Sequence, residues 1–474
     1  MRGDPIEGTM ERMRLTDMAQ ALNVHVEGAA GVEAVGVSTD SRTVRPGDLF
    51  FAIRGDNFDG HEYVEDAFAK GACAAVVSEA RASGACASDG PRLFVPDTVD
   101  ALLRLSGWYR DRFEVPVVAI TGSNGKTTTK DMTASVLSRL YRTAKTRGNY
   151  NNHIGVPMTL FELTSEHQAA VVEMGMNHSG EIARLAEAAR PSVGVITNVS
   201  EAHMETMRDV DTIAAAKAEL LDALPADGTA VLNWDDERVK ALWTRGPGNV
   251  ITFGLSPDAE VRATDIEAGA EGVSFELADG GRVELPVPGR HNVMNALAAI
   301  AVGRAMGVSD DDAKAGLAEF EMSPMRMSLV RVGSWTIIND AYNCNPGSLV
   351  AALEVLVEAA GEGTSAAALG DMLELGDTSE RAHREAGARA AELGVDRLYL
   401  LGTEVSALEA GALEAGMPAS RVRTYKSKTA LVESLRKELD EPAVLLVKGS
   451  RGMRMEEVVE LLTAEAPASR SAEA

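Results

Sequence analysis

The chain has 474 residues, 45% of them hydrophobic and 25% charged, a composition typical of a soluble globular protein with about three domains. A formal net charge of −25, without any block of Lys and Arg, argues against a nucleic-acid partner because a phosphate backbone would be repelled. Three widely spaced cysteines fit a reducing compartment better than a disulfide framework or a zinc site. We find no signal peptide and no apolar run long enough to cross a membrane, and we therefore expect a cytoplasmic protein.

The first periodic unit is predicted at residues 14–113. Residues 1–13 are polar and patternless, so we expect them to be disordered, like the tail at 465–474, and either Met10 or Met13 could be the true start. Between them and residue 113, short helical patterns alternate with strand-like runs such as LFFAI and RLFVPD. This alternation predicts a small α/β domain.

Two larger units follow, at residues 114–324 and 325–464. In the first, strand-like runs such as VPVVAITG, AAVVEMG and VGVITNV alternate with helical patterns, which predicts a parallel sheet with crossover helices. In the second, TIINDAYN, SAAALGDM, DRLYLLGT and PAVLLVKGS each read as a strand that ends in a polar or glycine turn. The predicted fold class is therefore α/β, with a small N-terminal α/β domain, a central P-loop parallel-sheet domain and a C-terminal Rossmann-like domain. Ligands of such sheets gather beyond the carboxyl ends of the strands.

The strongest local signal is ITGSNGKTTT at residues 120–129, between a predicted strand and a predicted helix. Glycines let backbone amides approach phosphate oxygens, and the helix N-terminus adds partial positive charge. A lysine neutralises the phosphates, and a threonine hydroxyl can bind magnesium. The spacing departs from the G-x-x-x-x-G-K-[ST] pattern, which counts against ordinary P-loop GTPases and kinases; a structural glycine turn is the alternative. The candidate ATP-binding residues here are Gly122, Ser123, Asn124, Gly125, Lys126, Thr127 and Thr128.

This loop resembles the ATP loop of the Mur ligases and of their relatives, the folylpolyglutamate synthases, which share the shortened spacing. Further motifs of that family follow in the family's order between about residues 38 and 456: GNYNNHIGVP, EMGMNHSGEI, TNVSEAHMETM, AAAKAEL, GRHNVMNALAA, NDAYNCNP and VKGSRGMRME. The chain is thus identified as a member of the Mur ligase family. The resemblance implies an ATP-dependent ligase that uses two Mg²⁺ ions and joins a carboxylate to an amine through an acyl phosphate.

The substrate expectations also come from the resemblance. Residues 36–72 resemble the uridine-binding domain of the members that add the third peptide residue or D-alanyl-D-alanine, a domain that the folate-adding relatives lack. EMGMNHSGEI, ALGDMLELGDTSERAHREAG and VKGSRGMRMEEVV favour addition of D-Ala-D-Ala to UDP-MurNAc-tripeptide over addition of diaminopimelate or lysine to the dipeptide. Whether the third residue of the tripeptide is diaminopimelate or lysine stays open, and we expect a monomer. A non-catalytic regulatory relative that binds nucleotide is the alternative from another class.

Four residues are candidate magnesium ligands. Glu173 ends a predicted strand and His203 follows another, although a Glu there is often only a cap and a lone His is more often structural. The resemblance implies that both bind magnesium together with Thr127. Lys217, on a predicted helix, would ordinarily be a solvated lysine, but the matching lysine of the family is carbamylated and acts as a carboxylate-like ligand. We expect Lys126, Lys217, His203 and Arg326 to be the catalytic residues.

The remaining candidates are also assigned through the resemblance. Arg326 would reach the γ-phosphate, with an interdomain salt bridge as its alternative role, and Asn292 and Asn295, three apart on one helix face, would lie near the adenine. Asp340 and Tyr342 would contact the nucleotide. Candidate contacts to the UDP substrate are Ser41, Arg42, Asn57, Asn149 and Asn152; those to the acceptor are Asn343, Asn345, Lys448, Ser450 and Arg451.

Overall fold

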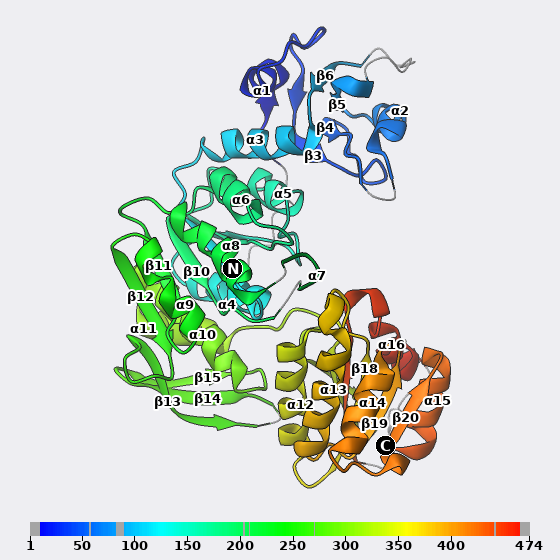
Figure 1. The fold of residues 1–474 in the computed structure, drawn as a ribbon. Coiled ribbons are helices and arrows are strands. Elements are labelled where there is room, and N and C mark those ends of the chain that lie inside the picture. Colours follow the sequence, from blue (N-terminus) through cyan, green and yellow to red (C-terminus); the bar gives the residue numbers. More distant parts are fainter. Residues whose placement is uncertain are drawn as a thin grey trace, which may run out of the picture.

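The computed structural model describes residues 10–55, 58–81, 90–201, 204–207, 209–269, 271–439 and 442–464. These form three α/β units, each with its own sheet, and the central unit lies between the other two (Figure 1). The predicted α/β class with three domains is therefore confirmed. Among the described residues, no helix combines the length and the apolarity that crossing a bilayer requires.

The N-terminal unit is built on a parallel sheet in the order β3-β4-β5-β6, beside a two-stranded pair β1-β2. Met10 and Met13 are buried at 5% and 2% exposure, so the expected disorder of residues 1–13 is wrong for these two. Two methionines in a polar stretch are too few to show a periodic pattern. The elements are β1 (Met13–Arg14), α1 (Leu15–Leu22), β2 (Glu33–Ala34), β3 (Gly36–Ser38), β4 (Asp48–Phe51), α2 (Val64–Ala69), β5 (Ala74–Ser78), β6 (Arg92–Val95) and α3 (Thr98–Arg110).

Helix α3 joins the first unit to the second. Its apolar residues belong to a core cluster that also includes residues of α1 and of the central helices α5 and α6. The Tyr109 side chain is fully buried, and its hydroxyl donates to the carbonyl of Leu163 at 2.7 Å and accepts from the amide of Glu11 at 2.9 Å. One continuous core thus holds the N-terminal unit on the central one.

The central unit has a nine-stranded sheet in the order β15-β14-β13-β12-β11-β10-β7-β9-β8. Strands β7 to β13 pair in parallel, and β14 and β15 add an antiparallel edge. The elements are β7 (Val117–Thr121), α4 (Lys126–Leu137), β8 (Thr143–Lys145), α5 (Gly155–Phe161), β9 (Ala169–Glu173), α6 (Glu181–Ala189), β10 (Val193–Ile196), α7 (Met204–Met207), α8 (Val210–Asp222), β11 (Thr229–Asn233), α9 (Glu237–Ala241), β12 (Asn249–Gly254), β13 (Val261–Ala268), β14 (Val273–Leu277), β15 (Gly281–Leu285), α10 (His291–Ala305) and α11 (Asp310–Ala318).

The inner strands of this sheet are mostly apolar because helices cover both faces, and polar residues stand at their carboxyl ends. Every residue of β7 and β9 is buried. Helices α4 and α10 share an apolar cluster with one face of the sheet, and α3, α5, α6 and α8 share another with the opposite face. The chain leaves β7 toward β8 and β9 on one side and returns to β10 on the other. The carboxyl end of β7 is therefore a topological switch point, where open sheets bind ligands.

The C-terminal unit has a six-stranded sheet in the order β16-β17-β21-β18-β19-β20, parallel except for β16. Helices lie on both faces, over two separate apolar clusters. The elements are β16 (Ser328–Val332), β17 (Trp335–Asp340), α12 (Pro346–Ala360), β18 (Thr364–Gly370), α13 (Ser379–Glu392), β19 (Arg397–Leu401), α14 (Val405–Glu414), β20 (Val422–Tyr425), α15 (Lys428–Glu438), β21 (Ala443–Lys448) and α16 (Glu456–Ala464).

Candidate active site

A cavity of about 550 Å³ lies where the phosphate loop of the central unit faces the first turns of the C-terminal unit. Gly122, with φ 154°, could not carry a side chain, because its Cβ would lie 1.8 Å from Thr197 Oγ1. Gly125, with φ 80°, caps α4, and a Cβ there would lie 2.4 Å from Asn295 Oδ1. The first amides of α4 lack intrahelical partners and carry the positive end of the helix dipole. The loop is therefore built to receive an anion such as a phosphate.

The segment after β10 holds this loop in shape. Asn198 and Asn124 exchange two hydrogen bonds: Asn124 N donates to Asn198 Oδ1 at 2.9 Å, and Asn198 Nδ2 donates to Asn124 O at 3.1 Å. Thr197 Oγ1 also donates to Asn124 O at 2.6 Å, and Ser123 Oγ donates to Ser200 O at 3.0 Å. The cradle is thus preformed by residues that the sequence singled out only as part of a family motif.

Lys126 begins α4 and folds back over the loop. Its Nζ donates to the carbonyls of Gly122 at 2.8 Å and Ser123 at 3.1 Å. Burial lowers the pKa of Lys126 from its ordinary value, while the nearby Glu173 carboxylate opposes this shift. Thr127 is buried at 2% exposure and lines the same cavity, as does Thr128. An ammonium group and a hydroxyl therefore lie beside the anion cradle.

Glu173, the last residue of β9, presents an incompletely bonded carboxylate to the cavity. Its Oε1 accepts from Asn151 Nδ2 at 2.7 Å, whereas Oε2 is buried without a hydrogen-bond partner in the described structure. The backbone of Glu173 is fixed by Thr146 Oγ1, which accepts from its amide at 3.1 Å. Such a buried orphan oxygen is costly unless a ligand satisfies it. Asn151, which orients Glu173, was not among the candidates, although it lies inside the motif that supplied Asn149 and Asn152.

Lys217 is a buried lysine on α8, with 3% exposure, and it lines the cavity. Among the described residues, none forms a hydrogen bond or ion pair with its amine. Burial lowers the pKa of Lys217 well below its ordinary value, and the charge of Lys126 lowers it further. Both effects shift the amine toward its neutral, nucleophilic form, unlike the solvated lysine that a helical pattern alone would suggest.

The metal candidates can be compared with these positions. His203 lies outside the described residues. Within the described ranges, no three His, Cys, Asp or Glu side chains come together. Mg²⁺ prefers oxygen ligands and shares them with substrate phosphates. The orphan Glu173 oxygen and the Thr127 hydroxyl are such ligands, and both lie beside the cradle, so the residues present fit a magnesium ion held jointly with a nucleotide.

Asn292 and Asn295 line the cavity, and both also hold α10 in place. Asn292 Nδ2 donates to the carbonyl of Pro288 at 2.7 Å, and Asn295 Nδ2 donates to Asn292 Oδ1 at 3.0 Å. Asn295 Oδ1 in turn accepts from Thr129 Oγ1 of α4 at 3.1 Å. The amides form a chain from α10 to the helix of the phosphate loop, with their expected common face confirmed.

Arg326 enters the cavity from the segment between the central and C-terminal units. Its guanidinium lies 4.0 Å from the centroid of the Tyr342 ring, a cation–π contact. The residues on either side, Met325 and Met327, have φ of 59° and 54°, a conformation that non-glycine residues rarely adopt. Among the described contacts Arg326 forms no ion pair, so the alternative of an interdomain salt bridge has no support.

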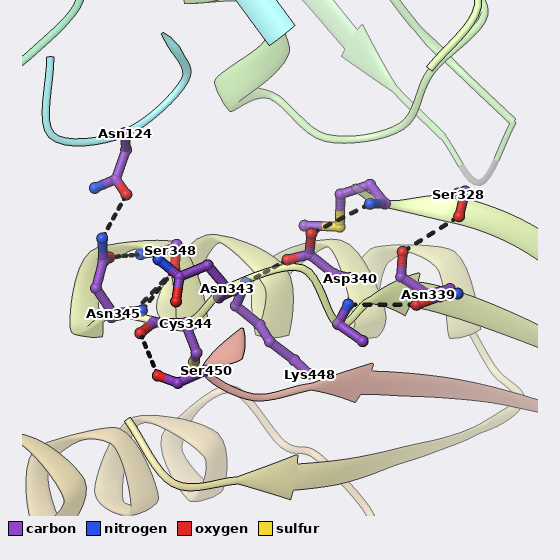
Figure 2. A network of polar contacts seen from close by, with 12 residues as sticks. Asn124, Ser328, Asn339, Asp340, Asn343, Cys344, Asn345, Ser348, Lys448 and Ser450 are labelled. Carbon is purple, nitrogen blue, oxygen red and sulfur yellow. Dashed lines mark hydrogen bonds and ion pairs between the residues drawn. The ribbon is translucent and has the colours of Figure 1, made fainter. Parts of the chain in front are cut away.

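Asp340 and Lys448 form a buried pair at the carboxyl ends of β17 and β21 (Figure 2). Lys448 Nζ lies 2.5 Å from Asp340 Oδ2 and also donates to the carbonyl of Asn343 at 2.9 Å. Asp340 Oδ1 accepts from the amide of Met327 at 3.2 Å. Asp340, Asn343 and Lys448 line the cavity, but the lysine amine is already paired and holds the loop after β17.

Asn345 connects the C-terminal unit to the phosphate loop (Figure 2). Its Oδ1 caps α12 by accepting from Ser348 N at 2.9 Å, and its Nδ2 donates to Asn124 Oδ1 at 2.7 Å. The neighbouring Cys344 is buried, and burial raises its pKa to about 11, so its thiol stays neutral. A neutral thiol is a poor nucleophile, so a nucleophilic role for Cys344 has no support.

Six described candidates from the sequence do not line this cavity, and two more, Asn57 and His203, lie outside the described residues. One of the six, Gly122, belongs to the loop itself, and its carbonyl accepts from Lys126. Ser450 Oγ donates to Cys344 O at 3.1 Å and accepts from Leu373 N at 2.8 Å, which ties two loops together. Asn152 Oδ1 accepts from Gly155 N at 2.9 Å at the start of α5, and Arg451 pairs with Glu456 at 2.7 Å. Ser41 and Arg42 lie in the N-terminal unit, where Arg42 is paired to Asp40.

Three models of known protein families match this chain, one in each of the three units. Residues 33–98 match the family model described as "Mur ligase family, catalytic domain", residues 120–303 the Mur ligase middle domain, and residues 325–451 the "Mur ligase, glutamate ligase domain". The chain is 38% identical over 463 residues to the UDP-N-acetylmuramoyl-tripeptide–D-alanyl-D-alanine ligase of Escherichia coli (strain K12), covering 96% of this chain and 99% of that one. It is 37% identical over 436 residues to the ligase of the same name from Bacillus subtilis (strain 168), covering 92% and 94%.

Solved structures are similar over the full length. The crystal structure of MurF from Acinetobacter baumannii has a TM-score of 0.88 and 33% sequence identity, covering 96% of this chain and 100% of that one. The MurF ligase of Thermotoga maritima, solved in complex with ADP, has a TM-score of 0.79 at 27% identity, covering 91% and 97%.

Proposed function

This chain belongs to the Mur ligase family, and we propose that it uses ATP to join D-alanyl-D-alanine to UDP-N-acetylmuramoyl-tripeptide, which gives the pentapeptide precursor of peptidoglycan. The observation that carries this proposal is the cavity itself: an anion cradle, an orphan carboxylate and a buried lysine with a lowered pKa face an arginine of the C-terminal unit. The relatives of this name span more than nine tenths of the chain.

The reaction needs activation because a carboxylate does not react with an amine in water. The tripeptide carboxylate attacks the γ-phosphorus of ATP, and the bond between that phosphorus and the β-phosphate oxygen breaks. ADP is the leaving group, and the tripeptide is now an acyl phosphate. The neutral amine of D-Ala-D-Ala then attacks the acyl carbon, phosphate leaves, and the amide nitrogen loses a proton. Positioning dominates such a transfer, and we infer that the first amides of α4 and Lys126 hold the phosphates while Arg326 faces the γ-phosphate.

We infer that Thr127, Glu173, His203 and Lys217, once carbamylated, would hold two magnesium ions. Bound magnesium would neutralise the charge on the phosphates. The lowered pKa of Lys217 and the absence of a partner for its amine among the described residues support its carbamylation, because only an uncharged amine adds carbon dioxide. Lys217→Ala should abolish activity, and bicarbonate or a short carboxylic acid should partly restore it. A fully active alanine variant would end this part of the proposal.

The other residue roles follow the three units. We propose that residues 14–113 bind the UDP end of the precursor with Ser41, Arg42 and Asn57, that 114–324 bind ATP, and that 325–464 bind the acceptor. Asn149 and Asn343 line the cavity and support substrate contacts there. For Asn152, Ser450 and Arg451 the hydrogen bonds within the fold support an indirect role, through loop positioning. Because ATP is made inside the cell, a cytoplasmic location belongs to the same proposal.

The direct test is incubation with UDP-MurNAc-tripeptide, D-Ala-D-Ala and ATP, followed by measurement of the product mass and of released phosphate. Each tripeptide, with diaminopimelate or with lysine at its third position, should be tried separately. UDP-MurNAc-dipeptide with diaminopimelate or lysine is the control. Product from that mixture would indicate the ligase that adds the third peptide residue instead. Phosphate release without a requirement for both substrates would favour a regulatory nucleotide-binding relative instead.

A further inference from the structure

The segment that carries Arg326 is tied to the phosphate-loop helix by a side chain that the mechanism above does not use. Ser323 lies between α11 and β16, and its Oγ donates to Asp131 Oδ2 of α4 at 2.6 Å. The two residues are 192 positions apart in the chain. This hydrogen bond therefore joins the central unit to the segment that leads into the C-terminal unit.

Asp131 is itself held in a fixed place. It is buried at 5% exposure, and its Oδ1 lies 2.7 Å from Lys145 Nζ and 3.3 Å from Lys130 Nζ. Lys130 also donates to the carbonyl of Thr146 at 2.9 Å. With Oδ1 occupied by two ammonium groups, Oδ2 is left to accept from Ser323. A charge-assisted hydrogen bond of this kind is stronger than one between neutral groups.

The chain between Ser323 and Arg326 is short and stiff. Three residues extend at most about 10 Å, Pro324 has a fixed φ, and a residue before proline is restricted to extended conformations. Met325 is in the left-handed region, and its carbonyl accepts from the amide of Tyr342 at 3.2 Å. Fixing Ser323 therefore restricts where Arg326 can lie.

Asp131 and the phosphate cradle belong to one rigid element. Asp131 is five residues after Lys126 on the same helix, a rise of about 7.5 Å. Any movement of the C-terminal unit that leaves the Asp131–Ser323 bond intact must keep Arg326 near α4. The position of Arg326 is then set jointly by the helix that holds the phosphates, through Ser323, and by the contacts of Met325 and Met327 with the C-terminal unit.

We propose that Asp131, through Ser323, is a positioning residue that sets the distance of Arg326 from the phosphate cradle. The inference rests on the proposed function, because Arg326 matters to the rate only if it faces the transferred phosphate. Neither Asp131 nor Ser323 lines the cavity, so their effect on catalysis would have to pass through the arginine.

The test is a double-mutant cycle on phosphate release that depends on D-Ala-D-Ala. Ser323→Ala should lower kcat by roughly tenfold, the effect of losing one charge-assisted hydrogen bond, with the KM for ATP within about twofold of wild type. Ser323→Thr, which keeps the hydroxyl, should restore most of the rate. In an Arg326→Ala background, Ser323→Ala should have no further effect, because the arginine that it positions is gone.

Ser135→Ala is the matched control. Ser135 lies on the same helix and its hydroxyl donates to the carbonyl of Gly316 at 2.7 Å, a contact within the central unit. This variant should keep the wild-type kcat. An unchanged kcat in Ser323→Ala, or an equal loss in the Arg326→Ala background, would overturn the inference while leaving the proposed function intact. A wild-type protein that releases no phosphate with either tripeptide would overturn both.

Discussion

Asn345 Nδ2 donates to Asn124 Oδ1 at 2.7 Å, and this bond joins the first turn of α12 in the C-terminal unit directly to the phosphate loop (Figure 2). The two residues are 221 positions apart. The same Asn345 side chain caps α12 through its oxygen, so one amide both starts a helix and contacts the nucleotide cradle. The position of the C-terminal unit and the shape of the loop are therefore coupled at this residue.

Asn345→Ser should separate these two roles. Serine caps a helix about as well as asparagine, but its short hydroxyl would not reach Asn124. We expect an unchanged melting temperature and a kcat/KM lowered roughly 3- to 10-fold, the effect of one lost hydrogen bond. Steady-state kinetics and a thermal melt measure the two effects. In an Asn124→Ala background the serine substitution should add nothing, and an equal loss in both backgrounds would contradict the role of this contact.

The hydrogen bond between Asn151 and Glu173 leads to a second prediction, which concerns the affinity for magnesium. Asn151→Ala should raise the Mg²⁺ concentration that gives half-maximal activity by about 10- to 100-fold, because a carboxylate that loses its orienting partner binds metal less well. The adjacent Asn152→Ala is the control: it removes a hydrogen bond to the first amide of α5, which lowers stability by about 1 kcal/mol. A magnesium titration that shifts equally in both variants would show that Asn151 acts only through the fold.

The sequence predicts those parts of the site that a local pattern encodes. The strand, glycine turn and helix at residues 117–137 were expected because apolar runs and glycines act over a few neighbouring residues. Asn151, Asn198 and Ser323 were missed, since their partners lie 22, 74 and 192 positions away and only the folded chain brings them together.

Long-range partners also limit what the sequence shows about Lys448 and Ser450. Both are candidate acceptor contacts through the family resemblance, and that assignment stays a prediction. Their partners, Asp340 and Cys344, are 108 and 106 positions away, so the turn read in isolation could not show that both side chains are already bonded within the fold.

The buried Lys448–Asp340 pair predicts a large cost when one partner is removed. Lys448→Met should lower the free energy of unfolding by about 3–5 kcal/mol, because the Asp340 carboxylate, only 14% exposed, would lose its partner charge. Lys428→Met is the matched control, since Lys428 pairs at 2.6 Å with Glu457 but both side chains are partly exposed; we expect about 0–1 kcal/mol there. Urea denaturation measures both. Equal losses would mean that burial of Lys448 adds nothing to the pair.

Lys217 makes the last prediction, on stability against pH in protein free of nucleotide and bicarbonate. Its folded-state pKa is lowered by burial, so between that pKa and the unfolded value of about 10.4 the unfolded chain binds more protons. The contribution of Lys217 should therefore make the wild type least stable at low pH, and the stability should recover as the pH rises toward about 10. Lys217→Met lacks this pH-dependent contribution.

The methionine variant should therefore be more stable than wild type, by an amount that grows as the pH falls from about 10, with a residual gain of about 1–3 kcal/mol at pH ~10, where only an unbonded neutral amine remains to be buried. Denaturation at several pH values measures the difference. The exposed Lys437→Met should change stability by less than about 0.5 kcal/mol at every pH. A Lys217→Met variant less stable than wild type at neutral pH would mean that the native amine has a partner, which would remove the reason for its modification.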